Sequence, residues 1–268
     1  MLLRSAPLGG KTIVPSKLEL LAVPGFPLVK PGDDLAALLA DCLAAAGLVL
    51  QDGDAVVFAQ KVVSKAEGRF VDLTQVAPSP RALALATVVA KDPRLVEVIL
   101  SELRRVVRQR ENVLIVEHRL GLVMANAGVD QSNVADPEAG EVALLLPEDP
   151  DASAQRLRAA LSRHYGCSLA VIINDSFGRP WRRGSVGVAI GCAGLTALVD
   201  LRGQPDMFGR TLRVTEVGLA DEVAAAASLL MGQADEARPI VIVRGLLLGG
   251  EGTPAAALIR SPDEDLFK

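Results

Sequence analysis

The chain has 268 residues, of which half are hydrophobic and 3% are aromatic, and its formal net charge is -4. This length suits one large domain or two smaller ones, and the composition excludes a disordered chain. The negative charge argues against a general nucleic-acid binder, and two histidines are too few for a histidine-rich zinc site.

The cysteines and the apolar runs indicate the compartment. Cys42, Cys167 and Cys192 form no CxxC pair, which suits free thiols in a reducing cytosol. The apolar run Val186–Val199 is shorter than the roughly 18–20 residues of a membrane helix, and Met1–Leu21 lacks the apolar core of a signal peptide. We therefore expect a cytoplasmic protein with no membrane segment.

Hydrophobic periodicity and turn residues predict the elements of the first half of the chain. In chain order we expect a strand at Leu18–Val23, a helix from Asp33 or Asp34 to about Ala46, a strand at Ala55–Val63, a polar loop at Ser64–Arg69, a helical stretch from Pro80 to about Arg108 broken near Asp92–Pro93, and strands at Val113–Glu117 and Leu122–Ala125.

The second half continues the alternation. The expected elements are a strand at Val142–Leu146, a helix at Asp151–Tyr165, a strand at Leu169–Ile173, a basic loop at Phe177–Gly184, a helix at Ala220–Met231 and a strand at Pro239–Val243. This order predicts an α/β fold with mixed sheets. No linker is marked, so we expect a single domain over residues 1–268 that could divide into two sub-lobes.

Two loops carry the residues that are best suited to a metal. Asp130 and Asn133 follow one expected strand, and Asp175 and Ser176 follow another. Hard cations such as Mg²⁺ take carboxylate, hydroxyl and amide oxygens and keep several waters. For either aspartate alone, an ordinary turn in which the side chain bonds its own backbone is the simpler interpretation.

Basic residues near these loops could bind an anion. Lys61 and Lys65 lie at an expected strand end, where they could neutralise phosphate or simply be solvated. Arg179, Arg182 and Arg183 surround Trp181, which suits either an anionic substrate with a planar ring or a surface turn. The sequence contains neither a GxxxxGK[ST] loop nor a GxGxxG motif, and it has no GxSxG nucleophile elbow.

Six segments together resemble the coenzyme F420-0:γ-glutamyl ligase family. In chain order they read VPGFPLVKPGDDL, QKVVSKAEGR, ANAGVDQSN, NDSFGRPWRRG, RGQPDMFGR and MGQA. The resemblance implies a ligase that joins L-glutamate to F420-0 through an amide and uses GTP. It also implies Mg²⁺ or Mn²⁺, with K⁺ assisting, and an unusual two-lobed α/β fold that forms an intertwined homodimer. No additional C-terminal nitroreductase-like domain is expected.

The same resemblance assigns residues to roles. The implied metal ligands are Asp130, Asp175, Ser176 and Gln233. The implied nucleotide contacts are Phe26, Pro27, Leu28, Val29, Gln60, Lys61, Lys65, Asn133, Met231, Gly232, Gln233, Ala234, Asp235, Glu236, Ala237 and Arg238. Asp130, Asp175 and Lys65 would carry the catalysis. Arg179, Trp181 and Arg182 are our own candidates for the anionic substrate and do not come from the family.

Three positions depart from the family pattern or vary within it. Asn174 stands where serine is common, Ser176 replaces threonine but keeps the hydroxyl, and Gln60 occupies a variable contact. Three alternatives stay open: an amide ligase for another acidic acceptor, a nucleotide-binding protein without turnover, and a metal-dependent phosphohydrolase.

Overall fold

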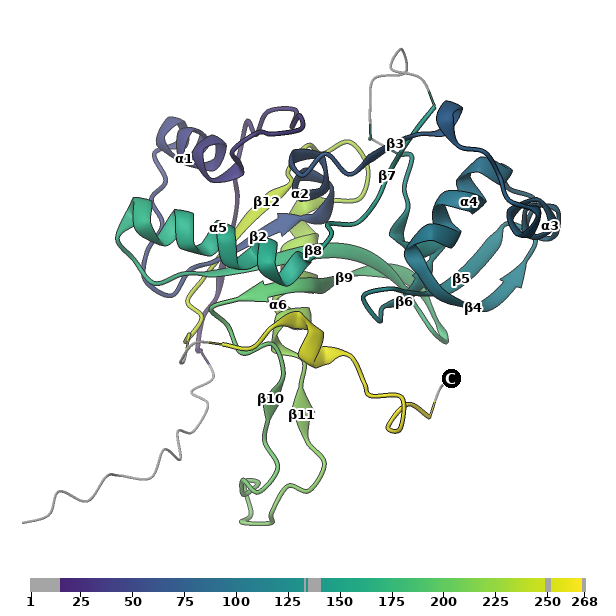
Figure 1. The fold of residues 1–268 in the computed structure, drawn as a ribbon. Coiled ribbons are helices and arrows are strands. Elements are labelled where there is room, and N and C mark those ends of the chain that lie inside the picture. The colour runs from purple at the N-terminus through teal and green to yellow at the C-terminus, as the bar shows by residue number, and fades with distance from the viewer. Residues whose placement is uncertain (1–14, 133, 135–140, 249–251, 267–268) are drawn as a thin grey trace, which may run out of the picture.

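A five-stranded mixed sheet forms the centre of the molecule (Figure 1). The computed structural model describes residues 15–132, 134, 141–248 and 252–266. The strand order is β1 (Glu19–Ala22), β12 (Ile240–Arg244), β2 (Ala55–Ala59), β8 (Ala170–Arg179) and β9 (Arg182–Ala193). β2 and β8 are parallel, and the other neighbours are antiparallel.

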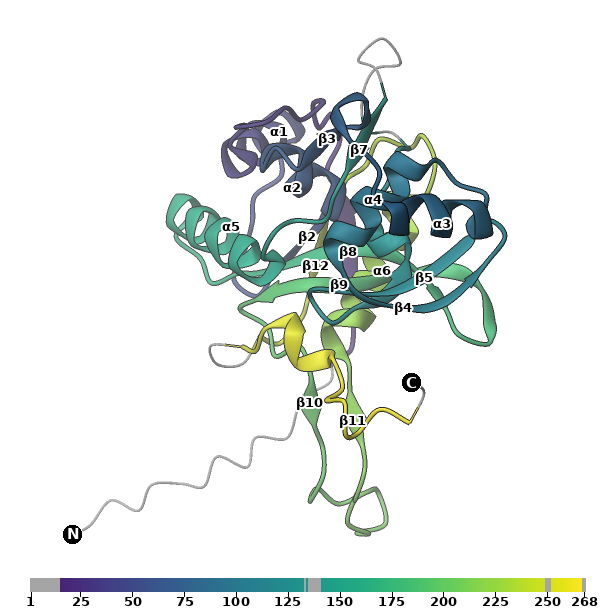
Figure 2. The ribbon, with the colours of Figure 1, turned by 45° about the vertical axis from the view of Figure 1, so that its right-hand side comes forward.

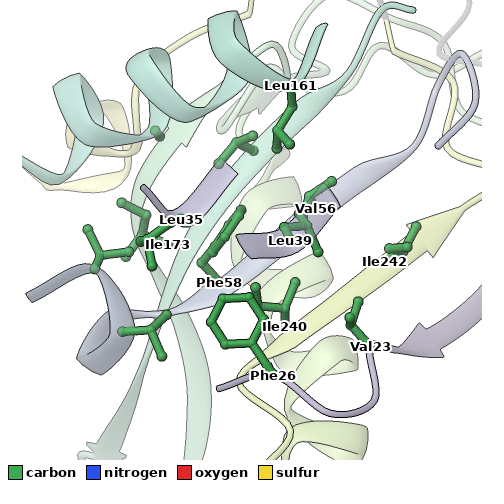
Figure 3. Packing of buried hydrophobic residues seen from close by; sticks show 14 of the residues in the cluster. Val23, Phe26, Leu35, Leu39, Val56, Phe58, Leu161, Ile173, Ile240 and Ile242 are labelled. Carbon is green, nitrogen blue, oxygen red and sulfur yellow. The ribbon is translucent and has the colours of Figure 1, made fainter. Parts of the chain in front are cut away.

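Helices cover both faces of this sheet, which explains its continuous apolar strands. The helices of one face are α1 (Leu35–Ala46), α2 (Gln60–Ala66) and α5 (Pro150–Tyr165), and α6 (Leu219–Met231) covers the other. Alternate residues of one strand serve the two cores: Ile173 packs under α1 and α5, while Ile172 packs against α6. Figure 3 shows the first core, in which Phe58 lies beside Leu39 and Ile173.

A smaller three-stranded sheet, here called the side sheet, lies beside the central one (Figure 2). Its strands are β4 (Leu103–Arg110), β5 (Val113–His118) and β6 (Val123–Ala125), and it shares a core with α3 (Pro80–Val89) and α4 (Pro93–Glu102). The short pair β3 (Phe70–Asp72) and β7 (Val142–Leu144) connects the two regions.

The remaining elements are short. A two-stranded arm, β10 (Val199–Asp200) with β11 (Glu216–Val217), projects away from both sheets (Figures 1 and 2). The 3-10 turns are η1 (Leu73–Gln75), η2 (Asn126–Gly128) and η4 (Ala255–Leu258). Within the described ranges, no helix has the length and apolarity to cross a membrane.

Local sequence signals position the helices as expected. Asp34 caps α1 by accepting hydrogen bonds from the Ala36 and Ala37 amides, and Gly47 ends that helix in the left-handed conformation. Asp149 and Ser79 cap α5 and α3 in the same way.

The mixed α/β class is confirmed, whereas the intertwined homodimer stays a prediction.

The expected strand at Ala55–Val63 is wrong beyond Ala59, and so is the polar loop that was to begin at Ser64. β2 pairs with β8 only as far as Ala59, where the next residues turn into α2. Val62 and Val63 favour a strand by propensity. The pairing with β8 has already ended, however, and from a helix both side chains are buried in the hydrophobic core.

Two further predictions are wrong for the same kind of reason. The helical stretch ends at Glu102, and Leu103–Arg110 instead pairs with β5 through a turn at Asn112 in the left-handed conformation. The strand expected to end at Ile173 continues to Arg179, because β9 pairs with it from Val171 to Arg179. The predicted basic loop is therefore mostly a hairpin. In each case pairing with the next strand overrides the propensity of the segment itself.

Candidate functional site

One edge of the central sheet carries a cavity of about 440 Å³. The carboxyl ends of β1 and β2 lie at this edge together with the amino end of β12, and β8 passes through it at Asn174. Ligands of open α/β sheets commonly bind beyond the carboxyl ends of the strands. The edge therefore gathers segments that are far apart in the sequence.

The cavity brings together most of the residues predicted to bind the nucleotide. Its lining residues are Phe26, Pro27, Leu28, Val29, Ala59, Gln60, Lys61, Val62, Lys65, Asn174, Asp175, Ser176, Met231, Gly232, Gln233, Ala234, Asp235, Glu236, Ala237, Arg238 and Pro239. Of the predicted nucleotide contacts, only Asn133 is missing from this set, and it lies outside the described residues. The apolar segment at Phe26 and the lysines of α2 line the same space.

Asp130 lies directly beside the cavity and is tied to it by Lys61. The Lys61 ammonium is 2.7 Å from Asp130 Oδ2 and also donates to the carbonyl and hydroxyl oxygens of Ser132, at 3.0 Å each. Ser132 in turn donates its amide to Asp130 Oδ1 at 2.8 Å. Burial raises the pKa of Asp130, but the hydrogen bonds from Lys61 and Ser132 outweigh it and lower that pKa.

The backbone around Asp130 is fixed by a tight turn. η2 precedes it with Asn126 and Ala127 in the left-handed region, and Asp130 exchanges two backbone hydrogen bonds with Leu144. A Cβ on Gly128 would lie 2.8 Å from the Leu146 side chain, so the turn also needs glycine there. The loop after β6 thus delivers its carboxylate in a defined position.

Asp175 occupies β8 and faces the same region. Burial raises its pKa to about 7, and the Asp130 charge adds to this effect while the Ser176 amide and Lys61 oppose it. The two carboxylates are therefore close enough to interact electrostatically. Lys65 lies one turn after Lys61 on α2, and burial together with the Lys61 charge lowers its pKa.

The segment after α6 forms another part of the cavity wall. Gly232 ends the helix with a positive φ of 73°, and its amide donates to the Ser228 carbonyl. The Glu236 carboxylate folds back against Gly232 and accepts a hydrogen bond from the Ala234 amide at 2.9 Å. This wall accounts for all the predicted contacts from Met231 to Arg238.

Sequence reasoning missed two polar residues of the site. Asn174 is buried in the cavity wall, where its amide donates to Ser228 Oγ at 3.0 Å and to Met231 Sδ at 3.4 Å. Its Oδ1 has no hydrogen-bond partner within the described part of the chain. Ser132 joins Lys61 to Asp130, and only its position two residues after an aspartate hinted at such a turn.

The predicted substrate residues lie elsewhere. Arg179 and Arg182 pair at the far end of the β8–β9 hairpin, and Trp181 forms its turn with a positive φ and 83% exposure. Arg179 donates to the Arg183 carbonyl at 2.9 Å. None of these side chains lines the cavity. Their substrate role stays a prediction.

The donor set fits a hard divalent cation that keeps most of its own waters. Among the described residues, no group of three or more histidines, cysteines and acids is arranged to hold a metal. Asp175 nevertheless lines the cavity beside which Asp130 lies, and burial together with the Asp130 charge disfavours the ionised form of Asp175. A divalent cation between them would remove that penalty, with Ser176 and Gln233 as further oxygen donors.

The fold and this site define a mixed α/β protein that holds paired carboxylates and lysines around a cavity of ligand size. The profile of the F420-0:Gamma-glutamyl ligase family matches residues 25–245. The chain therefore belongs to this family and is a ligase.

Curated relatives are similar in sequence to this chain over most of its length. A coenzyme F420:L-glutamate ligase from Methanothermobacter thermautotrophicus is 46% identical over 94% of this chain and 99% of its own length. One from Methanopyrus kandleri is 49% identical over 94% of this chain and 98% of its own length. One from Methanocaldococcus jannaschii is 42% identical over 82% of this chain and 86% of its own length.

Proposed function

We propose that this protein adds L-glutamate to coenzyme F420-0 through an amide bond, in coenzyme F420 biosynthesis, with GTP and a divalent metal. The observation that carries the proposal is the cavity at the sheet edge, which joins Lys61, Lys65 and Asp175 with the segments at Phe26 and Met231. The names of the curated relatives support the substrates. Small molecules are thus its proposed partners.

An amine does not react directly with a carboxylate, because the carboxylate oxygen is a poor leaving group. The carboxylate must therefore be activated first. An oxygen of the F420-0 carboxylate attacks the γ-phosphorus of GTP, the bond from that phosphorus to the bridging oxygen breaks, and GDP leaves with the electron pair. The amine of glutamate then attacks the acyl carbon. The carbon–oxygen bond to the phosphate breaks, phosphate leaves, and the amine loses a proton to the solvent. This acyl-phosphate route needs no covalent protein nucleophile.

The residues contribute position and charge. Lys65 supplies fixed positive charge to the phosphates, and the segments Phe26–Val29 and Met231–Arg238 enclose the nucleotide together with Gln60, Lys61 and Asn133. Asp130, Asp175, Ser176 and Gln233 would hold one or two ions of Mg²⁺ or Mn²⁺. When bound, the metal would neutralise charge on the phosphate oxygens.

Three finer points belong to the same proposal. Arg179, at the end of the β8–β9 hairpin, clamps the anionic acceptor. The support for this is that the same strand, β8, carries both Asp175 and Arg179. A monovalent cation such as K⁺ assists, and the enzyme acts as an intertwined homodimer in two-lobed form. The three free cysteines support a cytoplasmic location.

The test is incubation with F420-0, glutamate, GTP and Mn²⁺, followed by product mass analysis and measurement of GDP. Asp130→Asn and Asp175→Asn should each lower turnover about 100-fold or more, because each removes a charge that supports phosphoryl transfer. Asp41→Asn, on the exposed side of α1, is the control and should keep wild-type turnover. Near wild-type turnover in both site variants would overturn the metal assignment.

The same assay separates the alternatives. A ligase for another acidic acceptor would give a glutamate adduct only with that acceptor. A nucleotide-binding protein without turnover would show thermal protection by GTP and no glutamate-dependent GDP release. A phosphohydrolase would release phosphate from GTP with no acceptor present.

A further inference from the structure

We propose that Lys61 is the built-in counter-ion of Asp130, that a divalent cation displaces it, and that the displaced ammonium then serves the phosphates of the nucleotide. This inference rests on the proposed function. It adds a coupling between the two ligands: cation binding releases a positive charge that nucleotide binding needs.

The hydrogen bonds of Lys61 leave it no capacity for a phosphate. An ammonium has three donors. Those of Lys61 go to Asp130 Oδ2 at 2.7 Å, the Ser132 carbonyl at 3.0 Å and Ser132 Oγ at 3.0 Å. A phosphate can therefore engage Lys61 only after at least one of these bonds breaks.

The same count applies to the carboxylate. Asp130 Oδ1 accepts the Ser132 amide, and Oδ2 accepts both the Ser132 hydroxyl and the Lys61 ammonium. A carboxylate oxygen offers about two acceptor positions, so Oδ2 is fully used. A cation that ligates Oδ2 must replace a bond there, and like charge makes Lys61 the partner that leaves.

Lys61 is placed to move between the two roles. It stands in the first turn of α2, directly after β2, so its backbone is fixed by the central sheet. Its side chain lines the cavity and is 29% exposed. A lysine has a flexible four-carbon stem, so its ammonium can turn from Asp130 into the cavity without backbone movement.

Linkage fixes the sign of the coupling. If cation binding frees Lys61 for the nucleotide, then nucleotide binding must favour cation binding by the same factor. Without Lys61, the cation meets no positively charged competitor on Oδ2, where the Ser132 hydroxyl remains. The two ligands then lose this part of their cooperativity.

The test is calorimetric titration of the nucleotide-free protein with Mn²⁺, then with GDP in the presence and absence of Mn²⁺. Lys61→Met should tighten Mn²⁺ binding roughly fivefold, the size expected for one partly exposed competing ion pair. It should also shrink the factor by which Mn²⁺ strengthens GDP binding. Lys61→Arg keeps the positive charge of the side chain and should keep the wild-type Mn²⁺ affinity.

Lys65→Met is the matched control, because it removes the same charge from the same helix and cavity. It should change Mn²⁺ affinity much less than Lys61→Met. Equal tightening in both variants would mean a general charge effect and would overturn the inference, as would an unchanged affinity in Lys61→Met. Lys61→Gln replaces Lys61→Met if thermal unfolding shows that the latter is not folded.

Failure of the inference differs from failure of the proposed function. If the wild-type protein binds Mn²⁺ but Lys61→Met changes the Mn²⁺ affinity by no more than Lys65→Met does, the counter-ion role is wrong and the metal site stands. If the wild-type protein does not bind Mn²⁺ with or without GDP, both are wrong.

Discussion

Gly187 lies where β9 packs tightly against α6. A Cβ at this position would meet Ser228 Oγ and would lie 2.5 Å from the Ala224 carbonyl oxygen and 2.6 Å from Asn174 Oδ1. All three are held in place, because Ser228 bonds both Asn174 and the carbonyl of Ala224. Packing at this residue therefore supports the wall of the cavity that contains Asn174.

Gly187→Ala should destabilise the protein by about 1–3 kcal/mol, because the added methyl overpacks a rigid contact. The measurement is the free energy of unfolding in urea. Gly178→Ala is the control: a Cβ there meets nothing within 4 Å, and its effect should stay within about 0.5 kcal/mol. Similar values for both variants would show that β9 can move away from α6.

Asp130 and Asn174 show what residue patterns can and cannot predict. For Asp130, the residue pattern alone favours an ordinary turn, and it is the resemblance to the ligase family that predicts a metal ligand there. Nothing in the sequence indicates that Asn174 would be buried against Ser228, because that contact depends on how closely α6 packs on the sheet.

At the scale of elements, a charged network fastens the side sheet to the rest of the molecule. Glu102, at the end of α4, accepts hydrogen bonds from Arg69 at 3.3 Å and from Arg119 at 3.1 Å. His118 Nε2 lies 3.4 Å away, and its Nδ1 accepts the Leu120 amide. Arg69 and Arg119 also donate to carbonyls at Leu146 and Glu148, so four chain segments meet here.

This network should make stability depend on pH. Burial alone would raise the pKa of Glu102, but His118 and the two arginines outweigh it and lower the pKa from 4.5 to about 2. A lowered folded-state pKa means that the stabilisation is complete above pH 4.5 and is lost as the pH falls towards 2. The shift corresponds to roughly 3 kcal/mol at neutral pH.

Glu102→Gln should therefore be less stable than the wild type by up to roughly 3 kcal/mol at pH 7, and the difference should shrink at about pH 3.5. Urea unfolding of both proteins at the two pH values measures this. A difference that is the same at both would show that the loss comes from geometry and not from the Glu102 charge.

At the scale of the whole molecule, the arm of β10 and β11 carries apolar side chains into the solvent. Met207 is 88% exposed, Phe208 84% and Val214 84%. Single exposed apolar residues are ordinary, but such a group on a projecting arm is typical of a surface that another chain covers. The arm thus supports the proposed homodimer.

Light scattering after size exclusion should give twice the mass of one chain. The double variant Met207→Ser with Phe208→Ser should shift the protein towards the monomer, because it removes the apolar contact. Leu229→Ser, at an 80% exposed position on α6, should leave the dimer intact. A monomeric wild-type protein would contradict the homodimer directly.

The sequence by itself determined the class of fold and most helices, and it predicts the residues of the site. Caps such as Asp34 and Gly47, and apolar runs such as Leu169–Ile173, act through neighbours in the chain, so they are readable without a structure. The resemblance to one ligase family then assigned the cavity residues from Phe26 to Arg238.

Only the tertiary structure decided where β2 ends, that Leu103–Arg110 is a strand, and that β8 continues to Arg179, because each depends on whether a second strand pairs with the segment. The bonds from Lys61 to Asp130 and Ser132 also depend on the tertiary structure, since they join residues about 70 positions apart. Local chemistry specifies what a residue can do, and long-range packing specifies which partner it meets.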